Sequence, residues 1–279
     1  MRKNQISGLF SEFRHSKKAL AIPMTFLILF VSTLGLISIT YFFAVEKVNS
    51  QSQTLRIATA KQDLLSLNQN LMSVVWQPGS ARNVDISDSG GRINIQPLAG
   101  SLTIIVSDKQ DLNQTVYNQT TGQEVYELPY SDSPDTGLFL KGDSRTITNQ
   151  SGSTSTQLSI QNGAEHPEIQ LRYRPVISAA IAGTEDNRTV NNLRIYVINT
   201  NQSDSISLYG QVPLRISCES IHTTTLTYTV LYAISALTIT SVLNGISGQT
   251  SIPISSTSNG AVINVEIVQS TVIIERSLM

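Results

Sequence analysis

Catalysis or metal binding would need histidines, cysteines or carboxylates at defined spacings, and this chain has few of them. Its three histidines are far apart in the sequence, and none is at metal-ligand spacing to another: His15, His166 and His222. No Gly-x-Ser-x-Gly, phosphate-binding Gly-rich loop or His-Glu-x-x-His sequence occurs. The sequence therefore predicts a protein that is not an enzyme, with no catalytic residue, no metal ligand and no cofactor.

Pairs of acidic residues are the remaining candidates for chemistry. They are Asp85/Asp88, Asp108/Asp111, Asp132/Asp135 and Glu185/Asp186. Calcium binds clustered carboxylates and loop carbonyls, and the segment 85–91 (DISDSGG) is the most loop-like of these candidates. No pair has a full series of ligands beside it, so solvated turn residues are the simpler interpretation. A membrane-tethered hydrolase, another hypothesis, would need the fold to bring such an acidic cluster together.

Cysteines and sequons indicate the compartment. The single cysteine, Cys218, cannot form an intramolecular disulfide, and its strand-like context predicts a small buried side chain. Five Asn-x-Ser/Thr sequons are candidate N-glycosylation sites, and all follow the apolar segment described next: Asn113, Asn118, Asn149, Asn187 and Asn201. Their position agrees with an extracellular location for the carboxyl-terminal part.

A long uncharged apolar segment dominates the amino-terminal part of the chain. Residues 19–45 contain no Asp, Glu, Lys or Arg. At about 1.5 Å per helical residue the segment would extend about 40 Å, more than the ~30 Å hydrocarbon core of a bilayer. The sequence predicts a transmembrane helix here, with the lipid bilayer as its partner.

Charge sets the predicted orientation. The leader, residues 1–18, has five basic residues and one acidic residue, a net charge of +4, whereas the rest of the chain is net −5. Short basic flanks stay in the cytoplasm, so residues 46–279 are predicted outside in a single-pass cell-membrane protein. A cleaved secretory signal is the alternative, but its apolar core would be about 7–15 residues long. The acidic outer part has no basic stripe, which argues against nucleic acid as a partner.

Helical periodicity continues past the apolar segment. No Gly or Pro occurs from Glu46 to Trp76, and Pro78-Gly79 follows. Apolar residues recur at helical steps: Ile57, Ala60, Leu64, Leu67, Leu71 and Val74. Polar residues fill much of the rest: Gln51, Gln53, Gln62, Asp63, Asn68, Asn70 and Ser73. The pattern predicts an amphipathic helical extension over residues 46–77, continuous with the apolar helix.

After Gly79 the pattern changes to short apolar-polar alternations separated by turn residues, which is typical of antiparallel strands. The predicted strands are 92–96, 102–106, 124–128, 137–140, 157–161, 168–173, 193–199, 205–209, 212–217, 224–232, 236–242, 250–254 and 261–274. They predict an all-β, sandwich-like domain over residues 78–279.

Two polar segments, 146–156 and 183–190, could subdivide the β domain, and one or two lobes both remain open. Residues 220–265 contain no charged side chain. A second membrane span at 226–243 would have to include six Ser/Thr and two Tyr, so we favour strands there.

The whole arrangement resembles type IV pilin-like proteins, and the β-rich, cysteine-poor part is most similar to archaeal pilin-like surface proteins. The resemblance covers mainly residues 14–76: a basic leader ending in Lys17-Lys18-Ala19, an uncharged helix and its amphipathic continuation. In that family a membrane peptidase removes the leader and the retained helix packs into a filament core. The resemblance implies leader processing around Lys17, Lys18, Ala19 and Leu20. It also implies a leader peptidase and identical or related pilin-like subunits as partners.

These inferences predict a non-enzymatic pilin-like cell-surface protein, anchored or assembled through its hydrophobic helix. The alternative is a single-pass, membrane-anchored extracellular binding module or adhesin that forms no filament. Such an adhesin would keep its leader and would be a monomer in detergent.

Overall fold

The computed structural model describes residues 17–108, 110–129, 136–149 and 154–277, with backbone only for residues 17–22. The chain divides into two compact units, residues up to Thr54 and residues from Leu55 onward. The first described element, helix α2 (Lys17–Val74), supplies the first unit and the start of the second. Residues 1–16 of the predicted leader, with His15, lie outside the described residues, as do Asp132 and Asp135.

Helix α2 has 58 residues and closely matches the predicted helix. Pro23 lies near its start, and no break occurs between Glu46 and Val74. Pro78 and Gly79 follow the helix, and Gly79 has a φ of 79°, a left-handed conformation that glycine adopts readily.

The end of α2 is fixed through one backbone carbonyl. The carbonyl of Val75 accepts hydrogen bonds from the Ser270 hydroxyl and, at 3.3 Å, from the Cys218 thiol. Helix ends leave carbonyls without helical partners, so these side chains satisfy one of them. Cys218 is buried, as the sequence predicted.

The predicted apolar stripe of α2 is the centre of a hydrophobic core. Ala60, Leu64, Leu67 and Leu71 are fully buried, and Val74 is nearly so. They pack with buried residues on strands of both sheets. Burial of one helix face against sheets is what an amphipathic pattern specifies.

Two of the polar residues that lie beside the apolar stripe of α2, Asp63 and Asn68, are buried. Asp63 accepts a 2.8 Å hydrogen bond from the backbone amide of Ser87. Asn68 is 0% exposed and accepts a 2.8 Å bond from the Thr156 hydroxyl. The β unit therefore covers more of α2 than its apolar stripe, and Ser87 after β1 and Thr156 supply hydrogen bonds beside the stripe.

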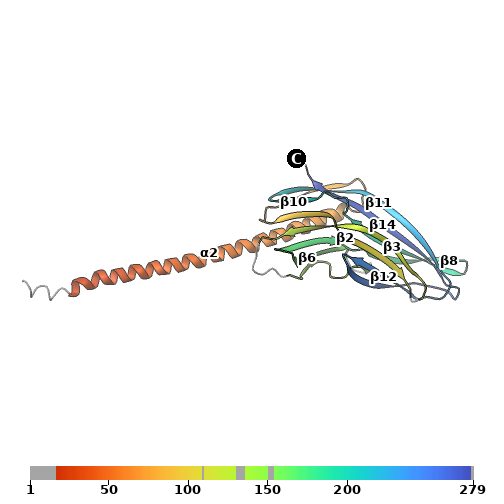
Figure 1. Ribbon diagram of the computed structural model, residues 1–279, viewed down its shortest axis with the longest axis horizontal. Coiled ribbons are helices and arrows are strands. Elements are labelled where there is room, and N and C mark those ends of the chain that lie inside the picture. Colours follow the sequence, from red (N-terminus) through yellow and green to blue (C-terminus); the bar gives the residue numbers. More distant parts are fainter. Residues whose placement is uncertain (1–16, 109, 130–135, 150–153, 278–279) are drawn as a thin grey trace, which may run out of the picture. The chain divides into compact units, whose positions relative to one another are not determined.

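The second unit contains two β-sheets (Figure 1). Within the described residues, sheet A has the order β1 (Ala81–Ile86), β11 (Val212–Val230), β14 (Ala261–Arg276), β9 (Arg188–Asn199), β8 (Val176–Glu185) and β5 (Thr148–Asn149). Sheet B has the order β13 (Ile246–Pro253), β12 (Ala236–Leu243), β2 (Arg92–Ser107), β3 (Asn113–Glu127), β7 (Pro167–Tyr173), β6 (Thr156–Asn162) and β4 (Phe139–Lys141), and β10 (Ile206–Tyr209) pairs with β2.

The sheets form two hydrophobic clusters. One surrounds α2 and includes Ile93 and Ile95 of β2 with Leu214 and Ile216 of β11. The other contains residues of both sheets without the helix, from β2, β9, β12 and β14: Leu102, Ile104, Val106, Leu193, Ile195, Val197, Leu237, Ile239, Ile263, Val265 and Ile267. The predicted class, a long helix followed by an all-β sandwich-like domain, is confirmed.

The strands are longer than the alternating patterns indicated. Predicted strands 212–217 and 224–232 belong to one strand, β11, which has a register shift between Cys218 and Ser220. Strand β2 likewise joins 92–96 and 102–106 across an irregular stretch between Gln96 and Gly100. Bulges insert residues without ending a strand, so they interrupt the alternation that sequence reading relies on. The segment 226–243 is strand, loop and strand, and no helix.

Strand β8 was not predicted, and the polar segment 183–190 is its turn into β9. Glu185 pairs with Arg188, and the two residues between them, Asp186 and Asn187, have φ values of 48° and 60°. Two positive φ values in a two-residue loop are the geometry of a type I′ hairpin, which favours Asn and Asp. The other candidate break, 146–156, includes β5 and residues 150–153, which lie outside the described residues.

Candidate functional site

The apolar part of α2 is the most distinctive surface of the chain. Every described side chain from Pro23 to Ser50 is exposed, including Phe26 at 74% and Phe42 at 67%. An 18-residue window has a mean hydropathy of 2.2, and none of it is buried. Within the described residues this is the one helix long and apolar enough to cross a membrane.

Four serine and threonine hydroxyl groups of this segment, including that of Ser32, donate to backbone carbonyls of the same helix. Thr33 donates to the carbonyl of Leu29 at 2.7 Å, and Thr40 donates to that of Leu36 at 2.8 Å. Ser38 makes the same contact four residues back, at 2.9 Å. An unpaired polar group is costly in hydrocarbon, so these internal bonds make the segment compatible with an apolar environment.

The residues expected to be processed lie at the start of this helix. Lys17, Lys18, Ala19 and Leu20 form its first turn in the described backbone. Leader cleavage there stays a prediction. Lys17 and Lys18 lie directly before the apolar segment. They are two of the five basic residues from which a cytoplasmic amino terminus was predicted.

The five sequon asparagines occupy different environments. Asn113 and Asn118 lie on β3, Asn149 on β5 and Asn187 in the β8–β9 turn, and all four are exposed. Asn201 is half-buried, its Nδ2 donates to the Thr120 hydroxyl at 3.5 Å, and its Oδ1 has no partner among the described residues. A glycan is attached at Nδ2, so the structure ranks Asn201 as the least accessible site.

We expect glycan occupancy to follow this ranking. In protein isolated from its native cells, peptides containing Asn113, Asn118 and Asn187 should carry glycans at higher occupancy than the peptide containing Asn201. Glycopeptide mass spectrometry measures this, with single Asn→Gln variants as controls for assignment. Higher occupancy at Asn201 than at Asn187 would contradict the ranking.

The acidic residues of these pairs that lie within the described residues are on strands, in turns or in loops. Asp85 lies on β1, and the Asp88 carboxylate accepts a 3.0 Å bond from the amide of Gly90. Burial raises the pKa of Asp108, but hydrogen bonds from the Tyr232 hydroxyl and from loop amides outweigh it, and its pKa is lowered overall. Among the described residues, no three His, Cys, Asp or Glu side chains are grouped so as to hold a metal ion.

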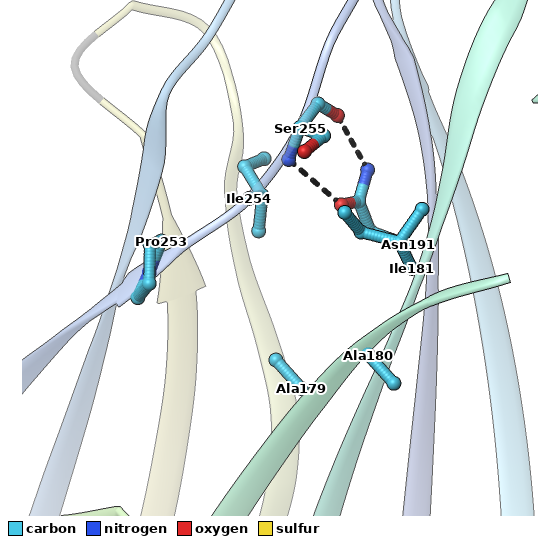
Figure 2. Close-up of a pocket in the computed structure, with 7 residues that line it drawn as sticks. All are labelled: Ala179, Ala180, Ile181, Asn191, Pro253, Ile254 and Ser255. Atoms are coloured by element: carbon cyan, nitrogen blue, oxygen red, sulfur yellow. Dashed lines mark hydrogen bonds between the residues drawn. The ribbon is translucent and has the colours of Figure 1, made fainter.

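A pocket of about 360 Å³ lies between β8, β9 and the segment after β13 (Figure 2). Its lining residues are Ala179, Ala180, Ile181, Asn191, Pro253, Ile254 and Ser255. Asn191 donates to the Ser255 carbonyl at 2.7 Å and accepts from the Ser255 amide at 2.9 Å. Both polar groups of the Asn191 side chain are therefore engaged with the backbone, and the lining contains no ionisable side chain.

A buried carboxyl group, Glu124, is a feature that the sequence interpretation missed. It lies on β3, opposite Ile95 of β2 and Leu171 of β7, and is 0% exposed. Burial raises its pKa to about 8, an effect that the nearby Thr200 hydroxyl only partly offsets. Neither carboxyl oxygen has a hydrogen-bond partner among the described residues, and the Tyr173 hydroxyl is likewise unpaired there. Glu124 is therefore expected to be protonated at neutral pH.

The alternation in residues 124–128 contained a signal for this burial. It places Glu124, Tyr126 and Leu128 on one face, and the structure buries all three. Val125, on the other face, is also buried, so both faces of β3 are covered here. Glu124 thus shares an apolar face, as the period of two implies.

The buried side chain of Arg174 holds the loop after β4 through hydrogen bonds. Arg174 donates to the carbonyls of Arg145 at 2.8 Å and Thr154 at 3.0 Å, and to the carboxylate of Asp143. The Arg145 and Arg174 guanidinium groups hold the pKa of Asp143 well below its usual range. These contacts are structural, because the guanidinium group is fully buried and faces backbone carbonyls.

Comparisons with protein-family models, with curated proteins and with solved structures find no match to this chain.

Proposed function

We propose that this chain is a non-enzymatic, pilin-like cell-surface protein that is anchored in the membrane or assembled into a filament through the apolar part of α2. The observation that supports this proposal most strongly is that the apolar side chains from Pro23 to Val45 are exposed, although later residues of the same helix lie in the core of the β unit. One element therefore combines a surface that needs an apolar environment with a segment that belongs to a folded domain.

The apolar segment of α2 is stable only where its side chains are shielded from water. Leaving a Leu, Ile or Phe side chain in water costs about 1.5–3 kcal/mol relative to burial, and this segment has many of them. Lipid chains and identical apolar helices can both cover it, because both remove apolar surface from water. Anchoring and filament assembly are therefore two states that the same helix can support.

The charge distribution supports an orientation with the amino terminus in the cytoplasm. Basic residues cluster before the apolar segment, in residues 1–18, while all five sequons follow it. The β unit, residues 55–279, would then lie outside the cell and form the exposed part of the protein.

Electron microscopy of cells that lack the protein separates the filament role from the adhesin alternative. A pilin-like subunit predicts surface filaments that disappear on deletion and return when the gene is restored. Filaments that persist, together with a loss of attachment to a surface or cell, would favour the membrane-anchored binding module. The small apolar pocket at Ile181 would then be the first place to test for a ligand.

A further inference from the structure

The edges of the two sheets differ in how they are protected. A sheet edge presents unpaired backbone N–H and C=O groups, and proteins shield such edges with charges, bulges, prolines or short strands. In the described part of the chain, most edges carry one of these devices. One long stretch of β11 carries none.

The protected edges are short or interrupted. Strand β1 bears Arg82 and Asp85, and β4 has three residues. The free part of β8 begins after Ile177, has a register shift between Ile181 and Gly183, and ends at Glu185. Strand β13 has eight residues, with Gly248 inside it and Pro253 at its end. Gly and Pro both weaken strand pairing.

The free edge of β11 runs from Ser220 to Val230. Strand β1 pairs with β11 only over Val212–Ser217, whereas β14 pairs with β11 up to Val230. The free segment therefore has 11 residues (SIHTTTLTYTV), with no charged residue, Gly or Pro and no register shift inside it. The free edge of β3, residues 113–123, is equally long, but it contains Gly122 and a register shift opposite Ile104 and Ile105. Among the described strands, the β11 segment is the longest free edge without such an interruption. In Figure 1 the strand labelled β11 follows one margin of the sheet that contains β14.

The two faces of this segment have different surroundings. Leu226, Tyr228 and Val230 pack with the hydrophobic cluster between the sheets. Thr223, Thr225, Thr227 and Thr229 are exposed. Thr227 donates to Asn264 at 2.9 Å, and Asn264 donates to Asn192 at 3.1 Å, so a side-chain ladder crosses β9, β14 and β11 as far as the edge.

We propose that this edge pairs antiparallel with the same edge of a second copy of the chain, so that sheet A continues across a two-fold axis. Full overlap of residues 220–230 places Thr225 at the axis and Thr223 opposite Thr227 of the second copy. Antiparallel pairing of identical edges gives a closed, isologous contact, the commonest form of dimer.

Chemistry favours a second copy over an unrelated strand. Two copies of this edge can pair without unfavourable contacts. The pairing brings no like charges together, and it places Thr opposite Thr, a pair that stabilises antiparallel strands. The pairing also satisfies the unpaired backbone groups of both copies at once. It requires only the β unit, so it goes beyond the proposed function and holds for an anchored protein as well as for a filament subunit.

Site-directed cross-linking of the full-length protein in detergent tests the contact. Under mild oxidation, the Thr225→Cys variant should form a disulfide-linked dimer, because the two side chains meet at the axis. Native Cys218 is 1% exposed and does not compete. The matched control is Gln114→Cys, an exposed position on β3 of sheet B. Cross-linking of Thr225→Cys at the level of this control, with strand content unchanged by circular dichroism, would overturn the proposal.

Charged substitutions at Thr225 give a second test of the contact, because a misfolded protein would not regain pairing when oppositely charged variants are mixed. Differently tagged copies of the Thr225→Lys variant should lose co-purification, because like charges then face each other across the axis. Mixing Thr225→Lys with Thr225→Asp copies should restore it. Failure of the mixture to restore pairing would contradict the β11 contact. So would strong cross-linking of Ala180→Cys on β8 or Gln249→Cys on β13 without cross-linking of Thr225→Cys.

Discussion

The Glu124→Gln variant should be more stable than the wild-type protein at pH 9 and almost equal to it at pH 4.5. Burial raises the pKa of Glu124 from 4.5 to about 8. Between these two values the folded state keeps a proton that the unfolded chain releases, so wild-type stability falls as pH rises. The difference of about 3.5 pKa units corresponds to at most on the order of 5 kcal/mol above pH 8.

Urea unfolding of the full-length protein in detergent, repeated from pH 4.5 to pH 9, measures this effect. Glutamine resembles the protonated carboxyl group in shape but cannot ionise, so the variant should lose this part of the pH dependence. Glu219→Gln is the matched control, because Glu219 is exposed on β11, and this change should leave the slope as it is. A wild-type slope that Glu124→Gln does not reduce would contradict the burial of a neutral carboxyl group.

Leu67→Ala should lower the free energy of unfolding of the β unit by about 2–5 kcal/mol. Leu67 is 0% exposed in the cluster that joins α2 to both sheets. Removing its side chain leaves a cavity that packed strands on several sides cannot fill, and the transfer and cavity terms add. Urea unfolding monitored by the near-ultraviolet signal of Trp76, the single tryptophan, measures the change.

Leu55→Ala serves as the control on the same helix. Leu55 is 68% exposed, so its truncation should change the free energy of unfolding by less than about 0.5 kcal/mol. Equal effects of the two substitutions would mean that the stripe at Ala60–Val74 is not the part of α2 that the sheets bury.

The helix and the fold class were predictable because they depend on long, regular patterns. Residues 19–45 lack any charge, and the stripe from Ile57 to Val74 repeats over five turns, so local errors do not alter either inference. The change to a period of two after Gly79 likewise identified an all-β domain. These signals come from the residues themselves and need no knowledge of distant contacts.

Strand length and pairing were less predictable, since they depend on distant partners. The bulge in β11 hid the continuity of one strand, and the Ala-rich β8 has no alternation to reveal it. Burial of Asn68 depends on Thr156, 88 positions further along the chain. Two turn signals were available and unused: Asp186-Asn187 and Asn244-Gly245 both form two-residue hairpin loops with positive φ values.

Some candidate functional surfaces could likewise be predicted from the sequence, whereas others depend on contacts that only the fold shows. The apolar segment and the sequons could be identified from the sequence, whereas the lower accessibility of Asn201 depends on its contact with Thr120. The free edge of β11 had a partial signal in the uncharged stretch 220–265. Only sheet order shows that part of this stretch lies at an edge, because pairing partners are not encoded in local alternation.

Mass spectrometry of the amino terminus of the native protein tests the central claim most directly. The pilin-like account predicts a mature protein that starts at Leu20 or a near neighbour and retains the apolar helix. An intact residue 1 would contradict leader processing and favour a permanently anchored binding module. A mature end beyond Val45 would contradict the account entirely, because the helix would then have been removed as a secretory signal.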